Sequence, residues 1–151
     1  MALLDLHHVA IKSSDLEVTE RFYTKILGMK KVKRPKFAFP GLWFEMGNTM
    51  FHIYGGTAAK THGGGFRYSQ KNSPVDHIAL RAKGFDKMKA VCKKNRCKWR
   101  QNDVPDFKLW QLFVLDPSGV VIELNFDVTE EPRGSKGPNL HNKFVAGRPF
   151  E

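Results

Sequence analysis

Residues 7–11 read HHVAI, and residues 76–80 read DHIAL. Both are short apolar runs of the kind that forms a buried strand, yet each contains a histidine, His8 in the first and His77 in the second. Aligning the two histidines also aligns the apolar residues around them. A strand that recurs with its histidine at the same place indicates an internal duplication of the chain.

The segments after each run follow one order. In the first half, SDLE at 14–17 is a capping box that places Ser14 at the start of a helix, and Gly28 is a natural helix end. Strand patterns at 41–47 and 49–55 then flank a tight turn. The first half is read as strand, helix and three strands. The second half repeats this order, with a helix pattern at 85–95 and strand patterns at 97–104, 109–116 and 120–126. The chain is therefore predicted to be an α+β protein built from two duplicated βαβββ modules.

The repeat divides the chain into four expected segments, namely module one at 4–55, a linker at 56–74, module two at 75–127 and a C-terminal tail at 128–151. The glycines of the linker predict a mobile connection or a lid. The tail is rich in proline, glycine and charge. We expect it to be disordered, or to lie along a partner subunit with Phe144 and Phe150 as its anchors.

The composition of the chain narrows its class. With 151 residues and 41% hydrophobic content, the chain can bury a well-formed core, and it has no apolar run long enough to cross a membrane. The N-terminus lacks the pattern of a signal peptide. The two cysteines, Cys92 and Cys97, form neither a CxxC motif nor a disulfide framework, which favours a reducing, cytoplasmic location.

The formal net charge is +10, and much of the excess lies in residues 29–36 and 86–100. Such a charge is typical of a nucleic-acid surface, of a pocket for a small anion, or of a solvated face without a partner. The sequence contains no nucleic-acid-binding motif. Nucleic acid therefore ranks below a small anionic molecule as the expected partner.

The predicted strands place ligating side chains on one face. Because side chains alternate along a strand, His8 and His77 point away from the apolar side of their strands, whereas His7 points the other way. The same rule separates His52 and Glu123 from the apolar residues of two later strands. Imidazoles and a carboxylate that face one cavity need a compensating charge, which a divalent metal ion supplies. We therefore predict a metal site that uses His8, His77 and Glu123, with His52 as its fourth ligand.

Five stretches of the chain resemble the vicinal oxygen chelate superfamily, and they occur in the order HHVAI, FYTKILGM, FHIYG, DHIAL and DPSGVVIEL. This superfamily includes glyoxalase I, fosfomycin thiol transferases, methylmalonyl-CoA epimerase, extradiol dioxygenases and bleomycin-binding proteins. The pair FYTKILGM and DPSGVVIEL is most similar to glyoxalase I. The resemblance implies two βαβββ modules that form a cupped, eight-stranded mixed sheet around a metal site.

The resemblance also implies a ligand set. The superfamily places one ligand on the first strand and one on the last strand of each module, and the corresponding residues are His8, His52, His77 and Glu123. Glyoxalase I usually has a glutamate at the second of these positions, so His52 is a departure from its pattern. This departure leaves the metal open among zinc, nickel, cobalt, iron and manganese. Members of the superfamily are often dimers, and a homodimer is therefore expected.

The function that the resemblance implies is a metal-dependent lyase or isomerase, which acts on a small anion chelated through adjacent oxygens. In glyoxalase-type chemistry a metal-bound carboxylate doubles as the base, and Glu123 is the sole carboxylate among the four candidates. Lys12 and Arg81 follow on the histidine faces of their strands and are expected to bind the substrate anion. Glyoxalase I carries an arginine where Lys12 stands. Tyr54 and Gln111 are further candidates for the pocket.

Two alternatives remain open. An Fe(II) extradiol dioxygenase would use His8, His77 and Glu123 as a facial triad. Such enzymes have a tyrosine where Phe113 stands, and they carry an upstream acid–base histidine that is missing from residues 98–112. The other alternative is a non-catalytic ligand- or drug-binding protein, like those that confer bleomycin resistance, although such members usually lack the metal residues.

Overall fold

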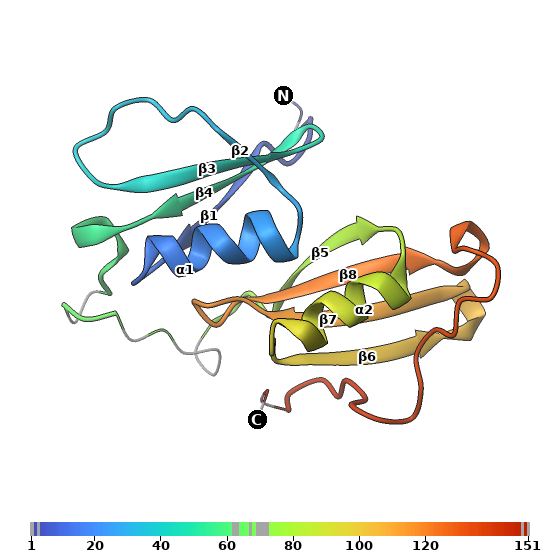
Figure 1. The fold of residues 1–151 in the computed structure, drawn as a ribbon. Coiled ribbons are helices and arrows are strands. Elements are labelled where there is room, and N and C mark those ends of the chain that lie inside the picture. Colours follow the sequence, from blue (N-terminus) through green and yellow to red (C-terminus); the bar gives the residue numbers. More distant parts are fainter. Residues whose placement is uncertain are drawn as a thin grey trace. The chain divides into compact units, whose positions relative to one another are not determined.

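The structure is a computed structural model that describes residues 2, 4–61, 64–66, 68, 73–148 and 150. The chain forms two compact units, residues 1–69 and residues 70–151. In the described residues each unit is one βαβββ module, so the predicted duplication, the α+β class and the eight strands are confirmed (Figure 1). No helix within the described part of the chain is long and apolar enough to cross a membrane.

The first unit is a mixed four-stranded sheet with the strand order β1-β4-β3-β2, in which β1 runs parallel to β4 and the other pairs are antiparallel. Its elements are β1 (His8–Lys12), helix α1 (Leu16–Arg21), β2 (Lys30–Val32), β3 (Gly41–Met46) and β4 (Thr49–Tyr54). The helical segment covers one face, where the Tyr23 ring lies 5.4 Å from Phe44 and 5.8 Å from Phe51 between centroids. These three rings are fully buried and form the core of the unit.

Helix α1 begins later than the capping box predicts. Its N-cap is Asp15, whose Oδ1 accepts a hydrogen bond of 3.0 Å from the backbone N–H of Val18. The prediction of Ser14 as the cap is wrong, because Asp15 is the residue that adopts the extended backbone of an N-cap. The helix continues as a π-helical turn, η1 (Phe22–Ile26), and Gly28 follows it with a φ of 73°, as the predicted helix end requires.

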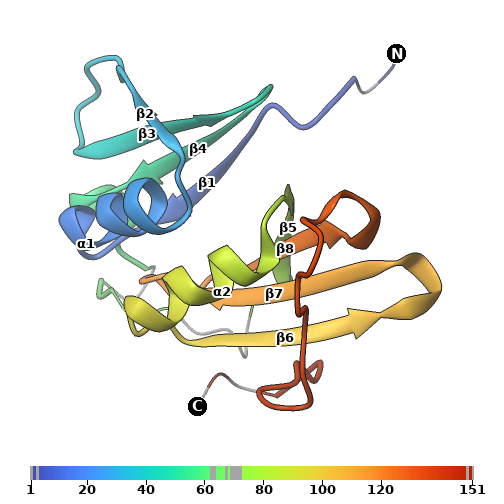
Figure 2. The same ribbon diagram turned by 45° about the vertical axis from the view of Figure 1, so that its right-hand side comes forward.

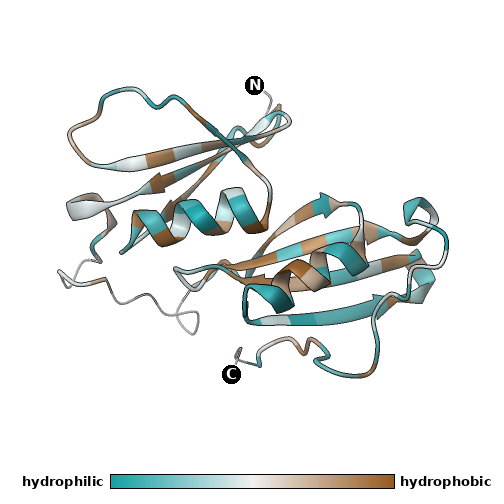
Figure 3. Cartoon of the chain, viewed as in Figure 1, coloured by the Kyte–Doolittle hydropathy of each residue, from teal (hydrophilic) through white to brown (hydrophobic). Residues whose placement is uncertain are grey.

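The second unit repeats this topology, with the strand order β5-β8-β7-β6 and β5 parallel to β8. Its elements are β5 (His77–Ala82), helix α2 (Phe85–Lys94), β6 (Trp99–Val104), β7 (Leu109–Leu115) and β8 (Val121–Asp127). Helix α2 covers one face of this sheet (Figure 2). On that face Phe85 packs edge-on against Trp110 and Phe126. In Figure 3 hydrophobic and hydrophilic residues alternate along parts of the strands, whereas β6 is mostly hydrophilic.

The two sheets share a register that determines where the candidate ligands lie. In unit one, His52 of β4 pairs with the residue of β1 two positions after His8. In unit two, Glu123 of β8 pairs with the residue of β5 two positions after His77. Residues two apart on a strand share a face, so each histidine lies on the same face as the candidate ligand of the neighbouring strand. In both units this is the face opposite the helix.

The C-terminal tail packs against its own unit. Backbone hydrogen bonds of 2.8 Å join Gln101 of β6 to Asn142 and to Phe144. The Phe144 ring stacks on Phe113 of β7 with centroids 3.7 Å apart, and Phe150 joins the same apolar cluster. The red tail accordingly follows the β6 edge in Figure 1. The prediction of a disordered tail is wrong for the described residues, because the tail pairs with an otherwise open edge strand and anchors both phenylalanines on its own chain.

The predicted mobile linker or lid falls partly on residues 62, 63, 67 and 69–72, which lie outside the described residues. Its described start forms a short 3₁₀ turn, η2 (Gly56–Ala59), directly after β4. The Tyr68 hydroxyl donates a hydrogen bond of 2.8 Å to the carbonyl of Ala59. The described start of the linker is thus held close to the end of the unit-one sheet.

Candidate metal centre

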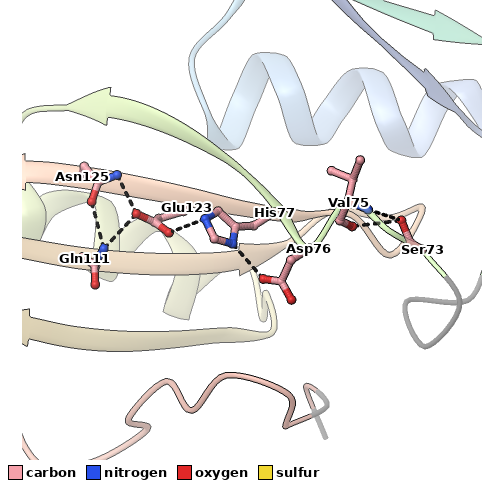
Figure 4. Close-up of polar contacts among 7 residues, drawn as sticks. All are labelled: Ser73, Val75, Asp76, His77, Gln111, Glu123 and Asn125. Carbon is pink, nitrogen blue, oxygen red and sulfur yellow. Dashed lines mark hydrogen bonds and ion pairs between the residues drawn. The ribbon is translucent and has the colours of Figure 1, made fainter.

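A histidine–glutamate pair lies on the face of the unit-two sheet that is opposite helix α2 (Figure 4). Nε2 of His77, from the start of β5, is 2.9 Å from Oε2 of Glu123, from the middle of β8. Glu123 is only 6% exposed, so its carboxylate is largely removed from water. A buried carboxylate in such a position requires hydrogen-bond donors, a proton or a cation as its partner.

Two side-chain amides hold the other oxygen of Glu123. Gln111 Nε2 donates to Oε1 at 2.8 Å, and Asn125 Nδ2 donates to the same atom at 2.7 Å. Asn102 in turn donates to the amide oxygen of Gln111 at 3.2 Å. This network leaves Oε2 as the oxygen that faces His77. Neither Asn125 nor Asn102 was among the predicted site residues, although alternation along β8 puts Asn125 on the face of Glu123, and both asparagines pair with Gln111.

Asp76 orients the ring of His77. Nδ1 of His77 lies 2.8 Å from Oδ1 of Asp76, the distance of a hydrogen bond from the ring to the carboxylate. A ring whose Nδ1–H donates to a carboxylate keeps its lone pair on Nε2, unless the ring carries a second proton. Because Nε2 faces the anionic oxygen of Glu123, this position requires either that second proton or a cation. Carboxylates behind the far nitrogen of a histidine are a common feature of metal ligands.

A stacked pair of histidines lies on the corresponding face of unit one. The rings of His8 and His52 have centroids 4.2 Å apart and planes inclined by 18°. His52 is 8% exposed, and Trp43 of β3 covers its second face, with centroids 4.2 Å apart and planes inclined by 6°. His52 is thus held between two rings, and packing fixes the orientation of its imidazole.

His52 has a buried nitrogen without a partner. Its Nε2 is one of two buried side-chain polar atoms without a hydrogen bond in the part of the chain that the structure describes. Burial lowers the pKa of His52 below the usual 6.5, and the nearby charges of His8, His7 and Arg34 lower it further. The neutral imidazole is the form that binds a metal ion. A buried polar atom of this kind costs stability unless a ligand satisfies it.

His7 lies beside His8 and not in the stack with His52. The Nδ1 atoms of His7 and His8 are 2.8 Å apart, which is a hydrogen-bond distance between one protonated and one free nitrogen. This contact occupies Nδ1 of His8 and leaves Nε2 as the nitrogen that can bind another group. An imidazole nitrogen can donate or accept, so this contact leaves a lone pair on Nε2 of His8 only when Nδ1 of His8 is the donor.

The donor groups of the two pairs suit a divalent transition metal. Two atoms that bind one metal side by side, each at about 2.0–2.2 Å, are roughly 3 Å apart. The 2.9 Å between His77 Nε2 and Glu123 Oε2 fits this spacing. Imidazole and carboxylate ligands are compatible with zinc, nickel, cobalt, iron and manganese. Within the described residues no three His, Cys, Asp or Glu side chains gather closely enough to hold a metal ion, so the candidate ligands meet only as one pair in each unit.

The fold and these paired ligands agree with a match to a known family. Residues 5–124 match the family model described as the Glyoxalase/Bleomycin resistance protein/Dioxygenase superfamily. The chain belongs to this superfamily. No curated protein sequence matches the chain.

Solved structures of superfamily members share the fold. A glyoxylase/bleomycin resistance protein/dioxygenase domain from Frankia sp. EAN1pec is 17% identical, with a TM-score of 0.68 over 89% of this chain and 96% of that one. Lactoylglutathione lyase from Agrobacterium tumefaciens is 17% identical, with a TM-score of 0.59 over 83% and 95%. TnmS3, an antibiotic binding protein from Streptomyces sp. CB03234, is 18% identical, with a TM-score of 0.62 over 84% and 98%. One neighbour is thus an enzyme and another a binding protein, so the superfamily fold alone does not select a function.

Two of the expected substrate-binding residues lie on the ligand face of unit one. Lys12 of β1 pairs with Tyr54 of β4, and Tyr54 follows His52 by two positions on the same face. Lys12 Nζ donates a hydrogen bond of 3.1 Å to the carbonyl of Lys60. Tyr54 packs against Phe39, with ring centroids 4.9 Å apart. Both residues therefore border the histidine pair, but both already have contacts within the unit.

The other two expected substrate-binding residues lie on the ligand face of unit two. Gln111 contacts Glu123 directly and acts as a support for that carboxylate. Arg81 is exposed near the end of β5 and pairs with Asn125 of β8. The structure thus brings Gln111 to the candidate ligand and leaves Arg81 farther along the same face.

Phe113 bears on the dioxygenase alternative within the superfamily. Its ring packs edge-on against His77, with centroids 6.2 Å apart, and its backbone pairs with Glu123. Phenylalanine offers no hydroxyl at this position beside the ligands. Phe144 from the tail stacks on the same ring, so an apolar aromatic cluster occupies this end of the face.

Acidification is expected to destabilise the metal-free protein more than it destabilises a His52→Gln variant. The pKa of His52 is below 6.5 in the folded chain, whereas the unfolded chain titrates near about 6.5. Below that pH His52 binds a proton more readily in the unfolded chain than in the folded chain. The free energy of unfolding is therefore retained above about pH 6.5 and falls as the pH drops below it. Urea unfolding at about pH 7.5 and about pH 5.5 measures both proteins, and equal losses would contradict the expectation.

Proposed function

We propose that the chain is a metal-dependent lyase or isomerase of the glyoxalase type that acts on a small anion. In this proposal His8, His52, His77 and Glu123 bind one divalent cation, and the two pairs come from one chain or from two chains of a homodimer. The observation that carries the proposal is the repeated register, which puts a first-strand histidine and a second ligating side chain on one face in both units. A purely structural role for one buried histidine would not explain why the same pairing occurs in both units.

The surroundings of the ligands support the same proposal. The buried Nε2 of His52 needs a partner, and the depressed pKa keeps this ring neutral and able to bind a metal. The facing atoms of His77 and Glu123 need a proton or a cation between them. One divalent cation would satisfy all of these groups together, and it would act as a Lewis acid toward two adjacent oxygens of the substrate.

Glu123 is the proposed base. Its Oε1 accepts two amide hydrogens, so Oε2 is the oxygen in position to take a proton. Glu123 would take the proton from one oxygen-bearing carbon of the substrate and return it to the adjacent one, while the hydroxyl proton passes from the first oxygen to the second, so the substrate isomerises without an added reactant. Gln111 and Asn125 keep the carboxylate in one orientation during this transfer.

The preference for an anion rests on charge. The formal net charge of +10 attracts anions to the protein in general, and Lys12 and Arg81 place two of the cations on the ligand faces. The two cysteines are free thiols, which fits the proposed reducing cytoplasm.

Metal uptake and a small activity screen test the proposal. Protein treated with a chelator is titrated with zinc, nickel, cobalt, manganese and Fe(II), and we expect one ion per chain. The loaded protein is then assayed with the hemithioacetal of methylglyoxal and glutathione, with fosfomycin and thiols, and with catechols under oxygen. Isomerisation of the hemithioacetal or of a related carbonyl anion supports the proposal. Ring cleavage of a catechol with Fe(II) would replace it with the dioxygenase, and ligand binding without metal uptake would replace it with a binding protein.

A further inference from the structure

The segment between β2 and β3 places an arginine beside two aromatic rings. The guanidinium carbon of Arg34 lies 4.7 Å from the ring centroid of Phe37 and 4.9 Å from that of Phe39. Its Nη2 also donates a hydrogen bond of 2.8 Å to the carbonyl of Phe39. Cation–π contacts on both rings and this hydrogen bond fix the position of the guanidinium before any ligand arrives.

Gly41, the first residue of β3, leaves the space that the arginine occupies. A Cβ at Gly41 would lie 3.2 Å from Nε of Arg34 and would collide with the carbonyl oxygen of Ile53. Any larger residue would therefore displace both the side chain and the neighbouring strand. The absence of a side chain at Gly41 thus leaves room beside β3 for the Arg34 side chain.

Arg34 is a cation without an acidic partner. Among the described residues, no ion pair joins its guanidinium to an aspartate or a glutamate. Of the five N–H donors of a guanidinium, one is used by Phe39. Both rings contact the guanidinium through cation–π interactions and use none of its N–H donors, so the other donors remain for a planar anion such as a carboxylate.

The rings around Arg34 lead to the candidate metal ligands of the same unit. The Phe37 and Trp43 centroids are 6.1 Å apart, and Trp43 stacks directly on His52. Phe39 packs on Tyr54, which shares the face of His52. Phe37 is nonetheless 49% exposed, so this aromatic surface is open to a ligand. The guanidinium of Arg34 thus lies beside a row of aromatic rings, here called the aromatic wall, which consists of Phe37, Phe39 and Trp43 and ends at His52.

We infer that Arg34, with the rings of Phe37, Phe39 and Trp43, forms a recognition site for an aryl carboxylate. The guanidinium edge binds the carboxylate, and the aromatic wall packs against the ring of the ligand. The inference rests on the proposed function only in naming this anion as the substrate, because the binding itself uses none of the four metal ligands. The inference makes Arg34 a third residue, beside Lys12 and Arg81, that binds the anionic group of the substrate.

Binding of phenylglyoxylate to chelator-treated, full-length protein tests the site. Calorimetry gives the Kd, and the indole N–H signal of Trp43 reports the place of binding. We expect Arg34→Met to weaken binding by at least about tenfold, as loss of a charge-assisted bidentate contact should. Arg34→Lys is expected to weaken it by a smaller factor, since it keeps the charge and loses the planar fork. Arg21→Met, which removes an exposed arginine of helix α1, is the matched control and should bind like the wild type.

Two results would overturn the inference. One is unchanged binding in both Arg34 variants, with circular dichroism showing that both are folded. The other is equal binding of acetophenone, which has the same ring and ketone but no carboxylate. Metal titration of Arg34→Met separates this inference from the proposed function, because the variant keeps all four proposed ligands and should still take up one ion per chain. Failure of metal uptake in all proteins, with Arg34-dependent binding intact, would overturn the proposed function alone.

Discussion

Replacing Glu123 by alanine is expected to lower the affinity for the divalent metal by at least about 100-fold, because loss of an outer partner alone costs about 10–100-fold. Glu123 is the one anionic group among the four proposed ligands and also the proposed base. The same change should therefore reduce turnover by a further factor of about 100 or more at saturating metal. Competition with a coloured chelator measures the metal affinity, and steady-state kinetics measures turnover.

Two further variants make the Glu123 result specific. Glu123→Gln keeps the shape and can still accept hydrogen bonds at Oε1 from Gln111 and Asn125, so it should remain folded while losing the charge. Glu17→Ala removes an exposed glutamate of helix α1 and should leave metal binding unchanged. Wild-type metal affinity in Glu123→Gln would show that this carboxylate is not a ligand.

Replacing His52 by alanine is expected to weaken metal binding by about 10–100-fold without abolishing it. One of four bonds to the metal is lost, and His8, His77 and Glu123 remain. Replacing His52 by glutamate should restore binding, because a carboxylate at this position reproduces the ligand pattern of glyoxalase I. Chelator competition measures all three proteins under the same conditions.

Packing around His52 requires a control for folding. His52 lies between His8 and Trp43, so the alanine variant leaves a gap that lowers stability as well as removing a ligand. His52→Phe refills this gap without a nitrogen, and it should bind metal as weakly as the alanine variant. Unchanged affinity in both variants would reduce the site to three ligands, which is the geometry of the dioxygenase alternative.

The duplicated strands and the ligand faces could be predicted because both depend on local patterns. Alternation along a strand is enough to separate His8 and His77 from their apolar neighbours. The repeat then relates β4 to β8, so His52 and Glu123 fall at matching positions of the two registers. These inferences need no knowledge of contacts between distant residues.

The remaining features depend on which residues meet in space. Phe144 reaches Phe113 only because the tail pairs with the edge of β6, and nothing local in a tail rich in glycine and proline predicts that pairing. Ser14 and Asp15 are both good N-caps by chemistry, and the backbone conformation decides between them. The contacts of Arg34 with two rings likewise depend on how the chain turns before β3.

X-ray absorption spectroscopy at the edge of the bound metal tests the four-ligand site most directly. The intact protein is loaded with one equivalent of zinc, and the ligand shell is compared with those of His52→Ala and Glu123→Ala. We predict three imidazoles and one carboxylate at about 2.0–2.2 Å in the wild type. One imidazole should disappear in His52→Ala, and the carboxylate should disappear in Glu123→Ala. A wild-type shell with fewer than three imidazoles, or a shell unchanged in both variants, would contradict the proposed site.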